Sequence, residues 1–85
     1  MRNIVFTSLA IKEYNEWFET NSRIVDRIKL LIREIDKDPF KGIGKPEPLR
    51  GNWKGYWSRR IDYEHRLVYK VTDEKIIIVK CKGHY

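Results

Sequence analysis

The sequence predicts a small α+β domain in which two N-terminal helices pack against a mostly antiparallel sheet. Apolar residues have helical spacing in the first half of the chain, a glycine- and proline-rich segment follows, and the last third alternates like β-strands. The 85 residues are enough for one domain, and a 13% aromatic content argues against a disordered chain. We therefore interpret residues 1–85 as a single domain with the order β-α-α-β-β-β.

The first elements are a strand and a helix. Residues 3–7 form a short run of β-branched and aromatic residues, long enough for one strand. Thr7 and Ser8 can then cap a helix, because their hydroxyls accept a hydrogen bond from a backbone N–H of the first turn. Spacings of three and four predict that its apolar face is formed by Ile11, Tyr14 and Phe18.

A second helix follows at once. Asn21 and Ser22 offer its cap, and Pro39 should end it near Asp38, since proline disfavours the helical conformation in the residue before it. Between these limits the apolar residues fall on one helical face. They are Ile24, Ile28, Leu31, Ile32 and Ile35.

Residues 40–53 predict a loop of about a dozen residues, a length that suggests a function. The loop has a single carboxylate, Glu47, between Pro46 and Pro48. Because proline fixes φ, the pair should preset the direction of the glutamate side chain. Its cations are Lys41, Lys45 and Arg50.

The last third predicts an antiparallel meander of three strands at residues 56–61, 65–71 and 76–81. Alternation in the middle strand directs His65, Leu67 and Tyr69 towards the core and leaves Arg66 on the open face. His65 is therefore more simply a packed or hydrogen-bonded histidine than a catalytic one.

Composition limits the classes of function. The net charge of +6 favours a polyanionic partner, although charge alone is weak evidence. One cysteine, Cys81, excludes an internal disulfide, and with two histidines it provides no set of four metal ligands. No apolar run is long enough for a membrane span. We expect a cytoplasmic protein with no cofactor and no membrane partner.

Two groups of residues could carry chemistry. Arg59 and Arg60 are adjacent in a strand, so only one can share a face with Arg66; they could bind phosphate or form a solvated surface. A loop carboxylate (Glu47) and a histidine after the last strand (His84) would suit acid–base chemistry on a phosphodiester. Such a combination also arises by chance, and terminal residues usually fray.

Four motifs in order carry a resemblance that covers essentially the whole chain. They are PFKGIGKPEPL at residues 39–49, GYWSRRI at 55–61, EHRLVY at 64–69 and the terminal HY at 84–85. In these motifs the chain closely resembles the YoeB/Txe toxins of the RelE-like superfamily of toxin–antitoxin modules. The resemblance implies a RelE-like fold, related to the microbial RNases, and a metal-independent endoribonuclease that cleaves mRNA on the translating ribosome.

The resemblance also implies partners and residue roles. The partners would be a YefM-like antitoxin, the ribosome with its mRNA, and a second copy of the chain in a homodimer. Glu47 would be the general base, His84 the general acid, and Arg66 the group that stabilises the pentavalent phosphate. The other implied site residues are Tyr85, which would position the nucleotide or His84; Arg50 and Arg60, which would hold phosphates; and Glu64, which would orient an arginine. From their charge we also expect Lys45 and Arg59 to bind RNA, with affinity that falls steeply as salt rises.

Two alternatives stay open on sequence alone. One is a basic module that docks on RNA or another partner without chemistry. The other is the gyrase-directed branch of the superfamily, which shares the fold but lacks this acid–base set. The retention of Glu47, Arg66 and His84 favours the ribonuclease, and cyclic phosphate ends on cleaved RNA would exclude a pure binding module.

Overall fold

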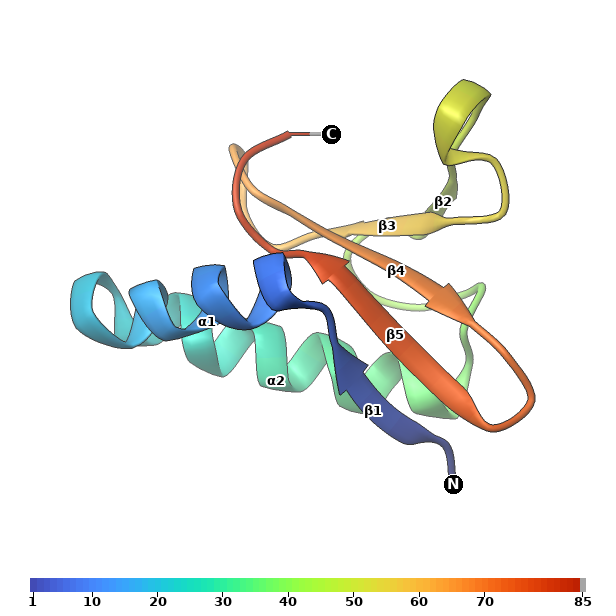
Figure 1. Cartoon of the computed structure of the whole chain (residues 1–85), viewed down its shortest axis with the longest axis horizontal. Coiled ribbons are helices and arrows are strands. Elements are labelled where there is room, and N and C mark those ends of the chain that lie inside the picture. Colours follow the sequence, from blue (N-terminus) through green and yellow to red (C-terminus); the bar gives the residue numbers. More distant parts are fainter. Residues whose placement is uncertain (85) are drawn as a thin grey trace.

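The computed structural model describes residues 1–84 of the chain. Along it the elements are β1 (Asn3–Phe6), α1 (Ser8–Thr20), α2 (Ser22–Lys37), β2 (Glu47–Pro48), the short 3₁₀ helix η1 (Gly51–Trp53), β3 (Trp57–Arg60), β4 (Arg66–Val71) and β5 (Lys75–Lys80) (Figure 1). The predicted α+β class and the order of the main elements are confirmed. Neither helix is long and apolar enough to cross a membrane in the part of the chain described.

The five strands form one sheet in the order β1-β5-β4-β3-β2. The predicted meander β3-β4-β5 is antiparallel throughout, whereas β1 pairs in parallel with β5. Strand β2 was not predicted, because two residues, one of them a proline and both following another proline, give no strand pattern. It pairs with β3 and turns the segment around Glu47 into an edge of the sheet.

The helix caps are as predicted, but the buried face of α1 is not. The Thr7 side chain accepts a hydrogen bond from Ala10 N, and the Asn21 side chain accepts one from Arg23 N. In α1 the buried residues are Ala10 and Trp17, while Ile11 and Phe18 are exposed. The predicted face was therefore wrong for α1: Trp17 occupies the buried stripe, and only Tyr14 of the expected set packs partly against the core.

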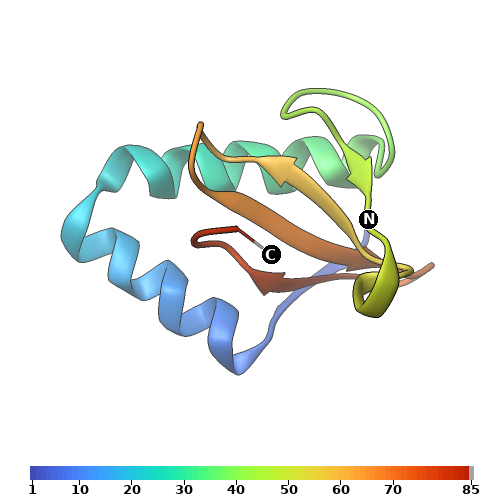
Figure 2. The ribbon, with the colours of Figure 1, turned by 90° about the horizontal axis from the view of Figure 1, so that it is seen from above.

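The core lies between the helices and one side of the sheet (Figure 2). The predicted apolar face of α2 is confirmed, with Ile28, Leu31 and Ile35 fully buried. Leu67 and Tyr69 of β4 face it, as the alternation predicted. The two helices leave the opposite side of the sheet uncovered, and this open face presents the candidate site.

Candidate active site

The strand register places four residues in one row across the open face. Glu47 on β2 lies opposite Ser58 on β3, Ser58 opposite Val68 on β4, and Val68 opposite Lys80 on β5. Ser58 and Val68 are buried, whereas Glu47 at the end of the row is exposed and forms no ion pair with a described residue. The row therefore has a carboxylate at one end and an ammonium at the other.

A second row on the same face carries two arginines. Arg60 on β3 lies directly opposite Arg66 on β4, two residues along from the first row. Strand spacing puts the Cα atoms of Glu47 and Arg66 about 12 Å apart, which leaves room for a phosphodiester between the two side chains. The prediction that Arg66 and one of its two arginine neighbours share a face is confirmed, and that neighbour is Arg60.

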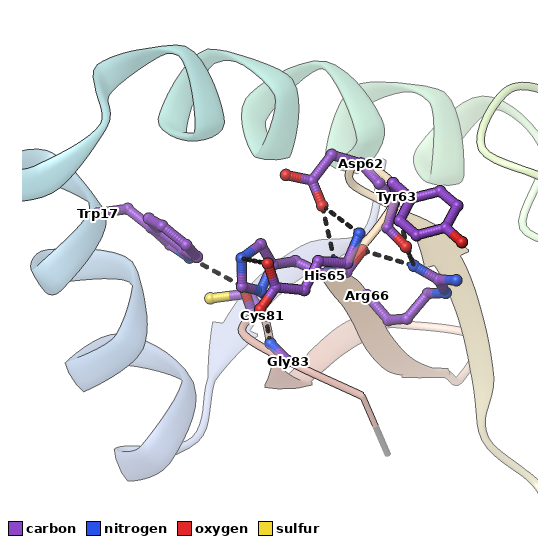
Figure 3. Close-up of polar contacts among 8 residues, drawn as sticks. Trp17, Asp62, Tyr63, His65, Arg66, Cys81 and Gly83 are labelled. Atoms are coloured by element: carbon purple, nitrogen blue, oxygen red, sulfur yellow. Dashed lines mark hydrogen bonds and ion pairs between the residues drawn. The ribbon is translucent and has the colours of Figure 1, made fainter.

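Arg66 is partly enclosed rather than fully open. Its Nη1 donates to the carbonyl oxygens of Asp62 (3.0 Å), Tyr63 (3.2 Å) and His65 (3.2 Å) in the β3–β4 turn (Figure 3). These bonds fix the direction of the guanidinium plane. Among the described residues Arg66 has no carboxylate partner, so its charge is not neutralised by an ion pair.

Arg59 corrects the sequence-based expectation of a residue that binds RNA. Its side chain is fully buried and donates to the carbonyl oxygens of Asp38, Lys41 and Ile43, and to the Tyr69 hydroxyl. A guanidinium with several donors in a fixed plane suits such a cluster of carbonyls. Arg59 therefore holds the loop after α2 in place and cannot contact a phosphate from this position.

Gly44 brings the same loop down onto the sheet. It has φ +83°, and a Cβ built there would lie 3.0 Å from Leu31 Cδ2 and 3.1 Å from Arg59 Cβ. A side chain would collide with the core, and L-residues rarely adopt this backbone conformation. The close approach allows the Gly44 carbonyl to accept a hydrogen bond from Arg60 N at 2.6 Å. Gly44 lies three residues before Glu47, so this bond anchors the chain that leads to the glutamate.

The remaining predicted cations are exposed. Lys45 follows Gly44 with an unusual positive φ of 51°, and Arg50 precedes η1 beyond the end of β2. Neither they nor Arg60 form an ion pair with a residue that the structure describes. Their charges remain available to an external anion.

Glu64 does not have the predicted partner. Its carboxylate Oε1 lies 3.8 Å from His65 Nε2, and within the described chain it pairs with no arginine. The expectation that Glu64 orients an arginine is therefore not met within the described residues, where the charged group nearest its carboxylate is the imidazole of His65. His65 is packed and hydrogen-bonded, as predicted, with a side chain only 14% exposed.

The chain after β5 passes beside the start of β4. His84 is exposed, and its carbonyl accepts a hydrogen bond from Lys80 Nζ at 2.6 Å. The other predicted terminal residue, Tyr85, lies outside the described residues. Cys81 is fully buried, and burial raises the pKa of its thiol to about 12, so it stays protonated at neutral pH and is no nucleophile.

Sequence reasoning missed Lys80 as a possible site residue. It ends β5 on the same face as the first row and donates to the tail that carries His84. Strand alternation could not reveal it, because Lys80 has the parity of the buried Ile76 and Ile78, and only the register shift between Val68 and Tyr69 brings Lys80 opposite Val68. Across residues 1–84, no group of three or more His, Cys, Asp or Glu side chains is arranged to hold a metal ion.

The arrangement thus brings a carboxylate, two arginines and a histidine-bearing tail to the side of the sheet that the two helices do not cover. This side of the small α+β domain is rich in cations. The exposed Glu47 and Arg60 and the partly exposed Arg66 can contact an extended anionic ligand there. Comparison with known proteins identifies the family of the chain. The chain belongs to the family described as the YoeB-like toxin of bacterial type II toxin–antitoxin systems, because the family model matches residues 6–85.

Individual relatives agree over nearly the whole chain. Toxin YoeB of Streptomyces coelicolor is 54% identical over 82 residues, covering 96% of this chain and 98% of that toxin. A YoeB/ParE toxin structure from Agrobacterium tumefaciens is 44% identical with a TM-score of 0.94, covering 98% and 99% of the two chains. A YoeB–YefM complex from Staphylococcus aureus is 45% identical with a TM-score of 0.91, covering 100% and 99%.

Two further relatives are a YoeB described as a dimer and a toxin described as an mRNA interferase. A structure of a YoeB dimer from Staphylococcus aureus is 45% identical with a TM-score of 0.94, covering 99% of this chain and 98% of that one. The mRNA interferase toxin YafQ of Escherichia coli is 33% identical over 46 residues, 54% of this chain and 50% of YafQ. The chain is therefore a toxin of a type II toxin–antitoxin system.

Proposed function

We propose that this toxin is an mRNA interferase that cleaves mRNA on the translating ribosome in the cytoplasm. The observation that carries the proposal is the register that brings Glu47 and Arg66 to the same open face, where the tail with His84 also lies. The YafQ relative, which is named an mRNA interferase, supports the same reaction class.

The proposed reaction transfers the phosphodiester to the neighbouring ribose hydroxyl. The Glu47 carboxylate accepts the proton of the 2′-hydroxyl, whose oxygen attacks the adjacent phosphorus. Arg66 stabilises the charge on the pentavalent phosphate, and protonated His84 gives its proton to the 5′-oxygen as the P–O5′ bond breaks. The products are a 2′,3′-cyclic phosphate and a 5′-hydroxyl, and no step needs a metal or cofactor. Tyr85 would position the nucleotide or His84.

The exposed cations would hold the RNA backbone. Arg60 adjoins Arg66 on the sheet, while Lys45 and Arg50 flank Glu47 along the chain. Phosphate contacts of this kind give affinity that falls steeply with salt. The partners we propose are the ribosome with its mRNA, a YefM-like antitoxin and a second copy of the toxin; the YoeB–YefM complex and the YoeB dimer among the structural relatives support the last two.

Glu47→Gln tests the proposal, because the amide has nearly the same shape but cannot accept the proton. We expect folding and RNA binding to be kept while cleavage falls by roughly 10²–10⁴-fold. The measurement is cleavage of mRNA on programmed ribosomes, with the ends of the products identified as cyclic phosphate and 5′-hydroxyl. Glu19→Gln, at an exposed position of α1, is the matched control.

Two results would contradict the proposal. Full cleavage by folded Glu47→Gln would remove this residue from the mechanism. Intact RNA with the unmodified toxin, together with tight binding to the ribosome, would favour the competing basic module that docks without chemistry.

A further inference from the structure

His65 is a conspicuous polar group of the β3–β4 region to which the proposed reaction gives no role. Its Nδ1 accepts a hydrogen bond of 2.8 Å from the backbone N–H of Gly83, the residue before His84. The carbonyl of Gly83 in turn accepts a bond of 3.0 Å from Arg66 N. Both backbone groups of Gly83 are thus held by consecutive residues at the start of β4 (Figure 3).

Helix α1 also holds the tail, at Cys81, two residues before Gly83. Glu13 Oε1 accepts a bond of 2.8 Å from Cys81 N, and Trp17 Nε1 donates to the Cys81 carbonyl at 2.9 Å. Gly83 adopts φ +73°, a conformation in which glycine is favoured, so the chain turns there towards His84. The contact with His65 is therefore the last side-chain contact to the backbone before His84.

The imidazole of His65 is itself fixed in direction. Its ring packs edge-on against Trp17, with centroids 4.7 Å apart and planes at 74°. Its backbone N–H donates to Asp62 Oδ1 at 2.7 Å. Because Nδ1 accepts from Gly83, the ring proton resides on Nε2, which faces the Glu64 carboxylate at 3.8 Å. Both ring nitrogens thus face groups of the chain itself, the Gly83 amide and the Glu64 carboxylate.

We propose that His65 is a positioning residue for His84: by accepting the Gly83 N–H it fixes the path of the tail that carries the general acid. This inference rests on the proposed function. A proton donor must lie within hydrogen-bond distance of the leaving oxygen, and a displacement of about 1 Å can reduce the rate by roughly 10²-fold. Gly83 immediately precedes His84, so loss of this bond loosens the position of the acid while the fold persists.

Two substitutions separate the acceptor from the packing. His65→Asn places a carboxamide oxygen, like Nδ1, one bond from Cγ, but removes most of the ring surface against Trp17. His65→Phe keeps a ring against Trp17 and removes the acceptor. We expect His65→Asn to retain turnover within about fivefold, and His65→Phe to lose roughly 10²-fold in kcat at unchanged KM. The pH profile of the remaining activity should keep its shape, because His84 still supplies the proton.

The opposite order of activities would overturn the proposal, since a purely structural histidine would be replaced better by phenylalanine. Equal loss in both variants, with the histidine-dependent limb of the pH profile removed, would make His65 the acid and overturn it as well. Two variants as active as the unmodified toxin would also refute it.

Amide hydrogen exchange at Gly83 gives a readout that does not depend on cleavage. We expect the amide to be protected in the unmodified toxin and in His65→Asn, and to exchange at least tenfold faster in His65→Phe. Protection that persists in His65→Phe would refute the inference alone. A toxin that leaves RNA intact while its Gly83 amide behaves as expected would refute the proposed function, and with it the catalytic purpose of the contact.

Discussion

The loop that carries Glu47 and the tail that carries His84 reach the same side of the sheet, but different contacts hold them. The loop is held from inside, by the buried Arg59 side chain and the close packing of Gly44. The tail is held mainly through its backbone, by Glu13, Trp17 and His65. The two proposed proton-transfer groups therefore depend on the fold to different degrees.

Substitutions in the loop and in the tail should therefore affect the free energy of unfolding and the cleavage rate differently. Contacts that hold the loop also belong to the core, so a change there should lower the free energy of unfolding as well as the cleavage rate. The contacts at Cys81 still involve the core through Trp17, but those at Gly83 and His84 lie beyond it, so a change at Gly83 or His84 should alter geometry with little effect on the fold. Arg66 at the start of β4 is connected to both segments, because its backbone N–H binds Gly83 of the tail and its strand partner Arg60 binds Gly44 of the loop.

The largest effect should follow from removing the tail. A chain that ends at Gly83 loses His84 and Tyr85, and we expect cleavage to fall by at least 10²–10⁴-fold, because the leaving oxygen is no longer protonated. The free energy of unfolding should change by less than about 0.5 kcal/mol, since only the bond from Lys80 Nζ is lost among the described contacts. Denaturant unfolding and ribosomal cleavage assays measure the two quantities.

His84→Gln is the companion to this truncation, because it keeps the chain length. Cells that express either variant without an antitoxin should grow, whereas the unmodified toxin should arrest them. Toxicity of His84→Gln at normal abundance would show that the acid lies elsewhere.

A comparison of the two adjacent arginines, Arg59 and Arg60, tests how the loop that carries Glu47 is held. Arg59→Met leaves loop carbonyls without their donor inside the protein, and we expect a loss of about 3 kcal/mol in the free energy of unfolding. Arg60→Met, on the exposed neighbour, should change stability by less than about 0.5 kcal/mol but weaken RNA binding and lower its salt dependence by about one counterion. Equal stability of the two variants would contradict the assignment of Arg59 to the loop.

The sequence predicted features that depend on a local repeat, but not contacts between residues far apart in the chain. Helix α2 was predicted with its buried face because its packing repeats at a local period, and the parity of a strand showed that Arg59 and Arg60 point to opposite sides. It could not show that Arg59 is the buried one, since its acceptors are carbonyls contributed by the loop at residues 38–43. The same limit applies to the tail, whose partner Trp17 is 64 residues away from Cys81.

Helix α1 shows how a local pattern can mislead. Ile11 and Phe18 have correct helical spacing but lie on the surface, where Phe18 packs edge-on against Tyr14 with centroids 5.2 Å apart. Trp17 is buried instead because its indole N–H reaches the Cys81 carbonyl, a partner that only the folded chain provides. The resemblance to the YoeB/Txe toxins nevertheless identified the family, because its motifs are read without knowledge of such contacts.

A smaller effect is expected at Arg66, which lies between the two regions: its backbone N–H holds Gly83, and its strand partner is Arg60. In Arg66→Lys the backbone bond and the charge remain, but the planar guanidinium is lost. The Nη1 atom of Arg66 donates to three turn carbonyls, which leaves the other edge of the guanidinium to face a phosphate. The single ammonium of a lysine cannot bind the carbonyls and the phosphate together.

We therefore expect Arg66→Lys to lower turnover about tenfold and RNA affinity by less than about threefold, with Arg60→Lys reversing this order. Single-turnover rates and binding isotherms at one salt concentration measure both, and equal losses in rate and affinity would reduce Arg66 to a binding residue.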